Sequence, residues 1–179
     1  MRLAVRSVTP YTGVAMSLTR PPVDYIERTR EQYAALGYPP YRWVRNDDRP
    51  PWAPVTKPLA ECRIGLIASG GVYVAGQVAF HYKDDTSFRV VDMETPTSEL
   101  RATHFAYDLA DARSDANVVF PIDTLRALAA ERVIGAVSRN AYTFMGGIYS
   151  SRKVKDLLAP ALAERIVNDE VDLALLVPV

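Results

Sequence analysis

Apolar segments of strand and helix character alternate along the last third of the chain, and this order constrains the fold most. Residues 122–135 and 153–168 repeat their apolar positions with helical spacing. Apolar runs typical of strands flank them at 118–120, 136–147 and 171–179. This order predicts right-handed crossovers and a parallel sheet. The expected fold class is therefore α/β, a mainly parallel sheet with flanking helices in a Rossmann-like three-layer arrangement.

Two further strands are predicted upstream. The segment 62–69, CRIGLIAS, is expected to be a buried strand that ends at Gly70-Gly71, and 88–92, FRVVD, is a short strand. Glycines after a strand can form a nucleotide-binding loop, but SGGVYVAG matches neither the dinucleotide nor the phosphate-loop pattern. A tight turn into a second extended piece is the better interpretation.

The beginning of the chain is predicted to be a separate arm. Residues 1–22 show no clear period, and a short amphipathic helix is expected over 23–37, with Asp24 near its start and Gly37 as its stop. The prolines of 38–58 exclude helix and favour an extended path. We therefore divide the chain into an N-terminal helix with a Pro/aromatic-rich arm, residues 1–60, and an α/β domain, residues 61–179.

Composition excludes several classes of protein. The formal net charge is +0, whereas proteins that bind nucleic acid or anionic membranes usually carry a basic surplus. No apolar run approaches the roughly 20 residues of a membrane span. Cys62 is the single cysteine, which precludes an internal disulfide and fits a reducing, cytoplasmic location. Its place at a strand start favours a small core residue over a catalytic thiol.

The candidate chemistry lies in the polar loop before residue 118. His104 and Asp108 could form a carboxylate-oriented imidazole for acid–base work, or both could simply lie on the surface. Neither histidine has carboxylates at ligand spacing, so we expect no metal site. Parallel sheets bind ligands beyond the carboxyl ends of their strands. Here that edge would gather Gly70-Gly71 and the loop after Phe144.

Several segments together resemble the selenoprotein B family of glycine, sarcosine, betaine and D-proline reductases, most closely the D-proline reductase type. The resemblance spans roughly residues 23–179, and its most specific part is DANVVFPID with the histidine-containing loop before it. The matching stretches are GYPPYRW, PPWAPVTKPL, IGLIASGGVY, THFAYD, DANVVFPIDTLRAL, NAYTFMGG and VDLALLVPV.

This resemblance implies an oxidoreductase. In the family, selenocysteine or cysteine follows the strand that matches DLALLVPV and attacks the carbon next to a nitrogen. We therefore expect reductive C–N cleavage of a small amine or amino acid, no cofactor within this chain, and selenocysteine directly after Val179, encoded by a UGA codon. A partner subunit with a pyruvoyl group would activate the amine, and we expect a homo- or hetero-oligomer.

The pocket implied by the resemblance combines two kinds of residue. His104 and Asp108 would be catalytic, with His104 moving protons. Substrate would be bound by the following residues: Gly70, Gly71, Asn117, Asp123 and Gly146.

Two other functions stay open at this stage. The chain could be a structural or regulatory subunit without a nucleophile, docking through the arm at 38–58. A nucleotide-binding sensor is less favoured because no phosphate loop is present.

Overall fold

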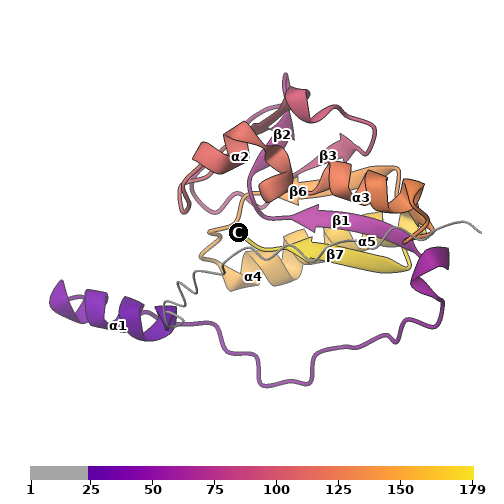
Figure 1. The fold of residues 1–179 in the computed structure, drawn as a ribbon. Helices are drawn as coiled ribbons and strands as arrows, with labels where there is room; N and C mark the ends of the chain where they lie inside the picture. The colour runs from indigo at the N-terminus through magenta and orange to yellow at the C-terminus, as the bar shows by residue number, and fades with distance from the viewer. Residues whose placement is uncertain (1–23) are drawn as a thin grey trace, which may run out of the picture. The chain divides into compact units, whose positions relative to one another are not determined.

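Figure 1 shows a computed structural model of the protein, which describes residues 24–179. The predicted lack of a period over residues 1–22 concerns residues that lie outside this range. The chain divides into two compact units, the first ending at Asp47 and the second running from Asp48 to Val179. None of the helices that the structure describes is long and apolar enough to cross a membrane.

The first unit contains one helix and the start of an extended arm. Helix α1 (Tyr25–Ala35) begins at Asp24, whose carboxylate accepts a hydrogen bond of 3.0 Å from the Glu27 N–H. It stops before Gly37, which has a φ of +70° that favours glycine. The predicted helix is therefore confirmed, and residues 38–46 are neither helix nor strand.

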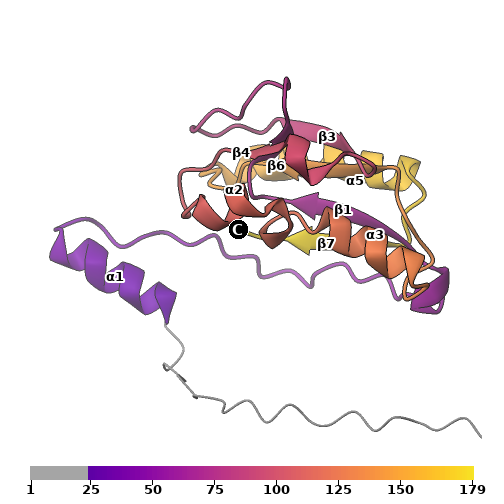
Figure 2. The same ribbon diagram turned by 45° about the horizontal axis from the view of Figure 1, so that its top comes forward.

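The second unit is built on a five-stranded sheet (Figures 1 and 2). Strand β1 (Arg63–Ala68) runs parallel to β7 (Leu173–Val177) on one side and to β5 (Ala136–Val137) and β6 (Asn140–Phe144) on the other. Strand β3 (Phe88–Asp92) pairs antiparallel with β6 and is the outermost strand on that side of the sheet. The predicted mainly parallel sheet is confirmed.

Helices cover the two faces of this sheet. One face of β1 packs with α3 (Ile122–Ala130) in a core that includes Leu66 and Phe120. The other face carries Tyr142, which packs with α5 (Ala159–Asn168). Burying one large apolar side chain contributes about 1.5–3 kcal/mol. These two cores therefore hold the α/β sandwich together.

A small two-stranded sheet carries the polar loop. Strand β2 (Val72–Val74) pairs antiparallel with β4 (Leu100–Ala102). The Thr103 N–H continues this pairing with a hydrogen bond of 3.0 Å to the Gly71 carbonyl. His104 is thereby placed next to the turn that follows β1. Three short helices complete this region: η2 (Thr97–Glu99), α2 (Ala110–Ser114) and η3 (Ala116–Val118). A fourth, η1 (Leu59–Glu61), precedes β1 at the other end of that strand.

Two local predictions were wrong. Residues 116–118 form the 3-10 helix η3, so the strand expected at 118–120 is absent, although Val119 and Phe120 are buried as their apolar character suggested. Strand β7 exists, but it is not buried: within residues 24–179 it pairs with β1 alone, and four of its five residues are exposed. The apolar run predicted burial on both faces, whereas β7 occupies a sheet edge.

The helix predicted over 153–168 has an irregular first half. It is built from α4 (Ser151–Lys153), a π-helical stretch (Val154–Leu158) and α5. Pro160 stands in the first turn of α5, where its missing N–H is tolerated.

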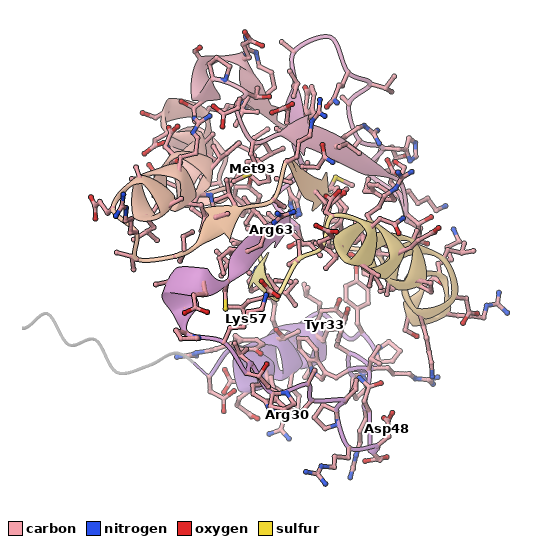
Figure 3. All side chains as sticks on the ribbon, turned by 90° about the vertical axis from the view of Figure 1, so that its right-hand side faces the viewer. Arg30, Tyr33, Asp48, Lys57, Arg63 and Met93 are labelled. Atoms are coloured by element: carbon pink, nitrogen blue, oxygen red, sulfur yellow. The ribbon has the colours of Figure 1, made fainter. Side chains whose placement is uncertain are left out.

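The amino-terminal end of β1 is charged, and Figure 3 views the molecule from this side. Lys57 lies 2.6 Å from the Asp172 carboxylate, and Arg63 lies 3.4 Å from the Glu170 carboxylate. Exposed ion pairs of this kind contribute little stability. These contacts join the start of β1 and the segment before it to the residues just before β7. The polar site lies at the opposite end of the sheet.

Candidate active site

Ser69 joins three segments at the carboxyl end of the sheet. Its N–H donates to the Val177 carbonyl at 3.0 Å, and its carbonyl accepts from the Gly146 N–H at 2.9 Å. Its hydroxyl oxygen accepts from the Val179 N–H at 2.9 Å. Figure 1 shows the C-terminus just beyond the tips of β1 and β7. The end of β7, the turn after β1 and the turn after β6 therefore meet at one residue.

His104 lies beside these turns, and its ring is held in one tautomer. The residue is only 8% exposed. Its Nδ1 accepts a hydrogen bond of 3.0 Å from the Ala106 N–H, which places the proton of the neutral ring on Nε2. That Nε2 is buried and has no partner among the described residues. Burial lowers the pKa of His104, so the uncharged ring is favoured.

Two aromatic rings pack against the imidazole. Phe105 stacks on it with ring centres 5.5 Å apart, and Tyr107 lies at 4.8 Å. The Tyr107 hydroxyl donates to the Gly70 carbonyl at 2.7 Å, and burial raises the pKa of that phenol. These rings exclude water from the imidazole and link it to the turn after β1.

Three of the predicted glycines surround the same point. A Cβ on Gly146 would lie 3.3 Å from His104 Nε2, and 3.4 Å from the carbonyl oxygens of Ser69 and Val179. Gly71 has a φ of +67°, and a Cβ there would lie 1.9 Å from the Thr103 carbonyl oxygen. Gly70 lies against Val179 and Val119. Their lack of side chains lets the turns approach His104 and the end of β7.

Asp108 does not orient the histidine. Its carboxylate accepts a hydrogen bond of 2.9 Å from the Ala110 N–H at the start of α2, and no hydrogen bond joins it to His104 among the described residues. The predicted carboxylate–imidazole pair is therefore not formed in this structure, because a backbone N–H occupies Nδ1 instead.

Asn117 and Asp123 form a separate network at the start of α3. The Asn117 amide donates to the Asp123 carboxylate at 2.9 Å, and its carbonyl accepts from the Asp123 N–H at 3.0 Å. Arg126 pairs with the same carboxylate and donates to the Met93 carbonyl at 2.7 Å. The hydrogen bonds from Asn117 and Arg126 lower the pKa of Asp123. This network caps α3 and ties it to the loop after β3.

Ser69, Tyr107 and Val179 were not among the predicted site residues. A serine at the end of a buried strand, directly before two glycines, was the available signal for Ser69. Cys62 is fully buried at the opposite end of β1, so it takes no part here. Within residues 24–179 no group of three or more His, Cys, Asp or Glu side chains could hold a metal ion.

The fold and this edge define an α/β protein with a buried histidine and glycine-containing turns beyond the carboxyl ends of its parallel strands. The sequence profile of the glycine/sarcosine/betaine reductase selenoprotein B family matches residues 40–178. The chain therefore belongs to the selenoprotein B family of these reductases, as its motifs predicted.

The relatives are subunits of reductases. The chain is 34% identical over 127 residues to the D-proline reductase subunit gamma of Acetoanaerobium sticklandii, covering 71% of this chain and 52% of that one. It is 31% identical over 134 residues to the glycine reductase complex component B subunit gamma of Symbiobacterium thermophilum, covering 72% and 31%. The chain thus spans about half the length of the first relative and less of the second. No solved structure matches it.

Proposed function

We propose that this protein builds part of the active site of a D-proline reductase-like enzyme that cleaves a carbon–nitrogen bond of an amino acid or amine. One observation carries the proposal: the buried, unpartnered Nε2 of His104 lies beside Val179 across the side-chain-free space at Gly146. In the resembled family the nucleophilic selenocysteine or cysteine follows the strand that matches β7. A nucleophile after Val179 would thus emerge next to a hydrogen-bond donor.

The proposed reaction cycle has three steps. A selenolate or thiolate after Val179 attacks the carbon that bears nitrogen, so that a bond from selenium or sulfur to carbon forms while the C–N bond breaks. The leaving nitrogen takes a proton. A second thiol then attacks the selenium or sulfur, the carbon takes a proton, and the two heteroatoms end as a bonded pair. A dithiol reduces that pair and supplies the two electrons of the cycle.

The roles of the predicted residues follow from their contacts. We propose that the uncharged His104 ring donates a hydrogen bond through its Nε2–H, because the Ala106 N–H already donates to Nδ1. Gly70, Gly71 and Gly146 would let substrate reach the backbone at this edge. We assign Asp108 to holding the loop after His104 at the start of α2. Substrate contacts by Asn117 and Asp123 stay predictions.

We also propose that the working enzyme is a hetero-oligomer in the cytoplasm. The relatives are subunits of multi-subunit reductases by name. A carbonyl group on a partner subunit, such as pyruvoyl, would activate the amine as a Schiff base. Selenocysteine or cysteine would follow Val179 in the active polypeptide.

Reductase assays test this proposal. The protein, extended past Val179 as in its relatives, is combined with its partner subunits, a dithiol and one substrate at a time: D-proline, glycine, sarcosine or betaine. We expect turnover with one of them, and a loss of roughly 100-fold in kcat for His104→Gln, the usual scale for a lost proton-handling group. His81→Gln, on the exposed loop, is the control. Undiminished turnover by His104→Gln would contradict the proposed role.

A structural subunit is the second candidate, and the exposed apolar surface of β7 favours it. In that case the protein would bind reductase subunits and raise their stability without any contribution to turnover. Turnover by the 179-residue chain itself would eliminate this alternative.

A further inference from the structure

The space between Ser69, His104 and Val179 has a chemistry that the family match does not assign. We infer that Ser69 and His104 together form a two-donor site that binds a selenolate or thiolate and lowers the pKa of the parent selenol or thiol. The inference rests on the proposed function, because it takes the nucleophile to follow Val179.

Ser69 is held by hydrogen bonds that leave its hydroxyl proton available. Its N–H and carbonyl are bound to Val177 and Gly146. Its hydroxyl oxygen acts as the acceptor for the Val179 N–H at 2.9 Å. A hydroxyl has one proton to donate, and no described residue accepts that of Ser69. The Ser69 hydroxyl is thus fixed beside Val179, the residue before the proposed nucleophile. Its proton is free to point toward that nucleophile.

His104 supplies the second donor. The residue is 8% exposed, and the Ala106 N–H holds Nδ1 as an acceptor, so the ring proton sits on Nε2. This Nε2 faces the space above Gly146 and has no partner among the described residues. Leaving a buried donor unpaired is unfavourable. A ligand that accepts this hydrogen bond would remove that cost.

The missing side chain of Gly146 lies between His104 and Val179. The point where a Gly146 Cβ would stand is 3.3 Å from His104 Nε2 and 3.4 Å from the Val179 carbonyl oxygen. A residue after Val179 has its Cα about 3.8 Å from that of Val179. Because the Val179 N–H bonds the Ser69 hydroxyl and the Val179 carbonyl oxygen lies beside Gly146, we infer that this side chain can reach both donors. Gly146 is the residue whose missing side chain keeps the space open.

Uncharged hydrogen-bond donors such as the Ser69 hydroxyl and the His104 Nε2–H can stabilise a selenolate or thiolate. Hydrogen bonds to the charged form of an acid favour that form and lower its pKa. The thiol or selenol would release its proton to solvent, and the anion would accept hydrogen bonds from the Ser69 hydroxyl and His104 Nε2–H. A thiolate is the reactive species in attack on carbon, so this shift would raise the active fraction at neutral pH.

The test measures the pKa of a thiol at this position. The 179-residue chain is extended by one cysteine after Val179 and a short Gly-Ser tail, and iodoacetamide alkylation is followed by mass spectrometry from pH 5 to 10. The only native cysteine, Cys62, is fully buried and slow to react. We expect a midpoint below the ordinary value of about 8.5. Ser69→Ala and His104→Phe should each raise the midpoint by roughly 0.5–1 unit, on the scale of one lost hydrogen bond.

Three further variants separate chemistry from folding. Ser69→Thr keeps the hydroxyl and should keep the lowered midpoint. Gly146→Ala fills the pocket and should raise the midpoint. Ser138→Ala removes another buried serine hydroxyl, which donates to the Asn140 carbonyl at 2.6 Å, and should leave the midpoint unchanged.

Two outcomes would overturn the inference. One is an ordinary midpoint in the parent protein that Ser69→Ala does not move. The other is an equal shift in Ser69→Ala and Ser138→Ala, which would mean that loosened packing alone is the cause. Neither outcome depends on turnover, so the proposed reductase function would still be judged separately by the substrate assay.

Discussion

His104 is buried, and no carboxylate among the described residues pairs with it, so the stability of the fold depends on pH. Burial lowers its pKa in the folded state, so the unfolded chain binds the proton more readily. The stabilisation is present above the unfolded pKa of about 6.5 and is lost as pH falls below it. We expect the melting temperature to fall between pH 7 and pH 5, and to fall less in His104→Gln.

His81→Gln is the matched control for this pH dependence. His81 lies on an exposed loop, where its backbone N–H donates to Asp85 at 2.8 Å. The variant removes an exposed imidazole and is compared with the loss of the buried one. An unchanged slope in His104→Gln would show that His104 is not the titrating group.

Gly71 gives a second prediction at the scale of one residue. A Cβ there would strike the Thr103 carbonyl at 1.9 Å, and the φ of +67° adds about 1–2 kcal/mol of backbone strain. Gly71→Ala should therefore lower the free energy of unfolding in urea by more than this strain alone. Gly76→Ala is the control, because its φ is +93° but no atom lies within 4 Å of its Cβ. Equal losses in the two variants would refute the clash.

Only part of the site could be predicted from residue types. A histidine in a polar loop and glycines after strands are visible in the sequence, and His104, Gly70, Gly71 and Gly146 do meet. The role of Ser69 depends on a hydrogen bond to Val179, which is 110 residues away. Asp108 was one candidate to orient His104, but short-range hydrogen bonds to backbone N–H groups occupy both side chains.

At the scale of elements, the network at the start of α3 can be tested directly. Asn117→Ala removes hydrogen bonds at 2.9 and 3.0 Å to Asp123, and should cost about 1–2 kcal/mol of unfolding free energy, as lost helix caps do. Asn168→Ala, an exposed position at the end of α5, should cost much less. If Asn117 bound substrate instead, its removal would raise KM at nearly constant stability.

Periodicity predicted the elements that lie over a core. Helix α3 and strand β1 were found where their patterns placed them, because their apolar positions match a buried face. Helix α1 has no buried residue, and its cap at Asp24 and the glycine after it predicted its ends. Strand β7 was misjudged in burial, since a run of leucines is equally apolar in the centre and at the edge of a sheet. The short α2 helix has only five residues, too few for a readable period.

At the scale of the whole molecule, an apolar edge remains uncovered. Leu176 is 65% exposed on β7, beside an apolar groove of about 330 Å³ between the sheet and α5. An exposed apolar edge strand is a ready site for pairing with another polypeptide. The relatives are subunits of reductases by name, and the matched segment covers 52% of the first and 31% of the second. We therefore expect β7 and this groove to be covered by another polypeptide segment in the assembled enzyme.

This expectation can be tested through a charge placed on that edge. Leu176→Lys puts an ammonium group where the apolar contact would form, whereas Val167→Lys puts the same charge at a 72% exposed position on α5 that does not line the groove. Light scattering of the free chain, and co-purification with the other reductase subunits, would measure assembly. We expect Leu176→Lys to weaken association at least 10-fold and Val167→Lys to leave it near the parent value. Equal effects of the two lysines, or none, would mean that assembly uses another surface, because only Leu176 lies on the unpaired edge.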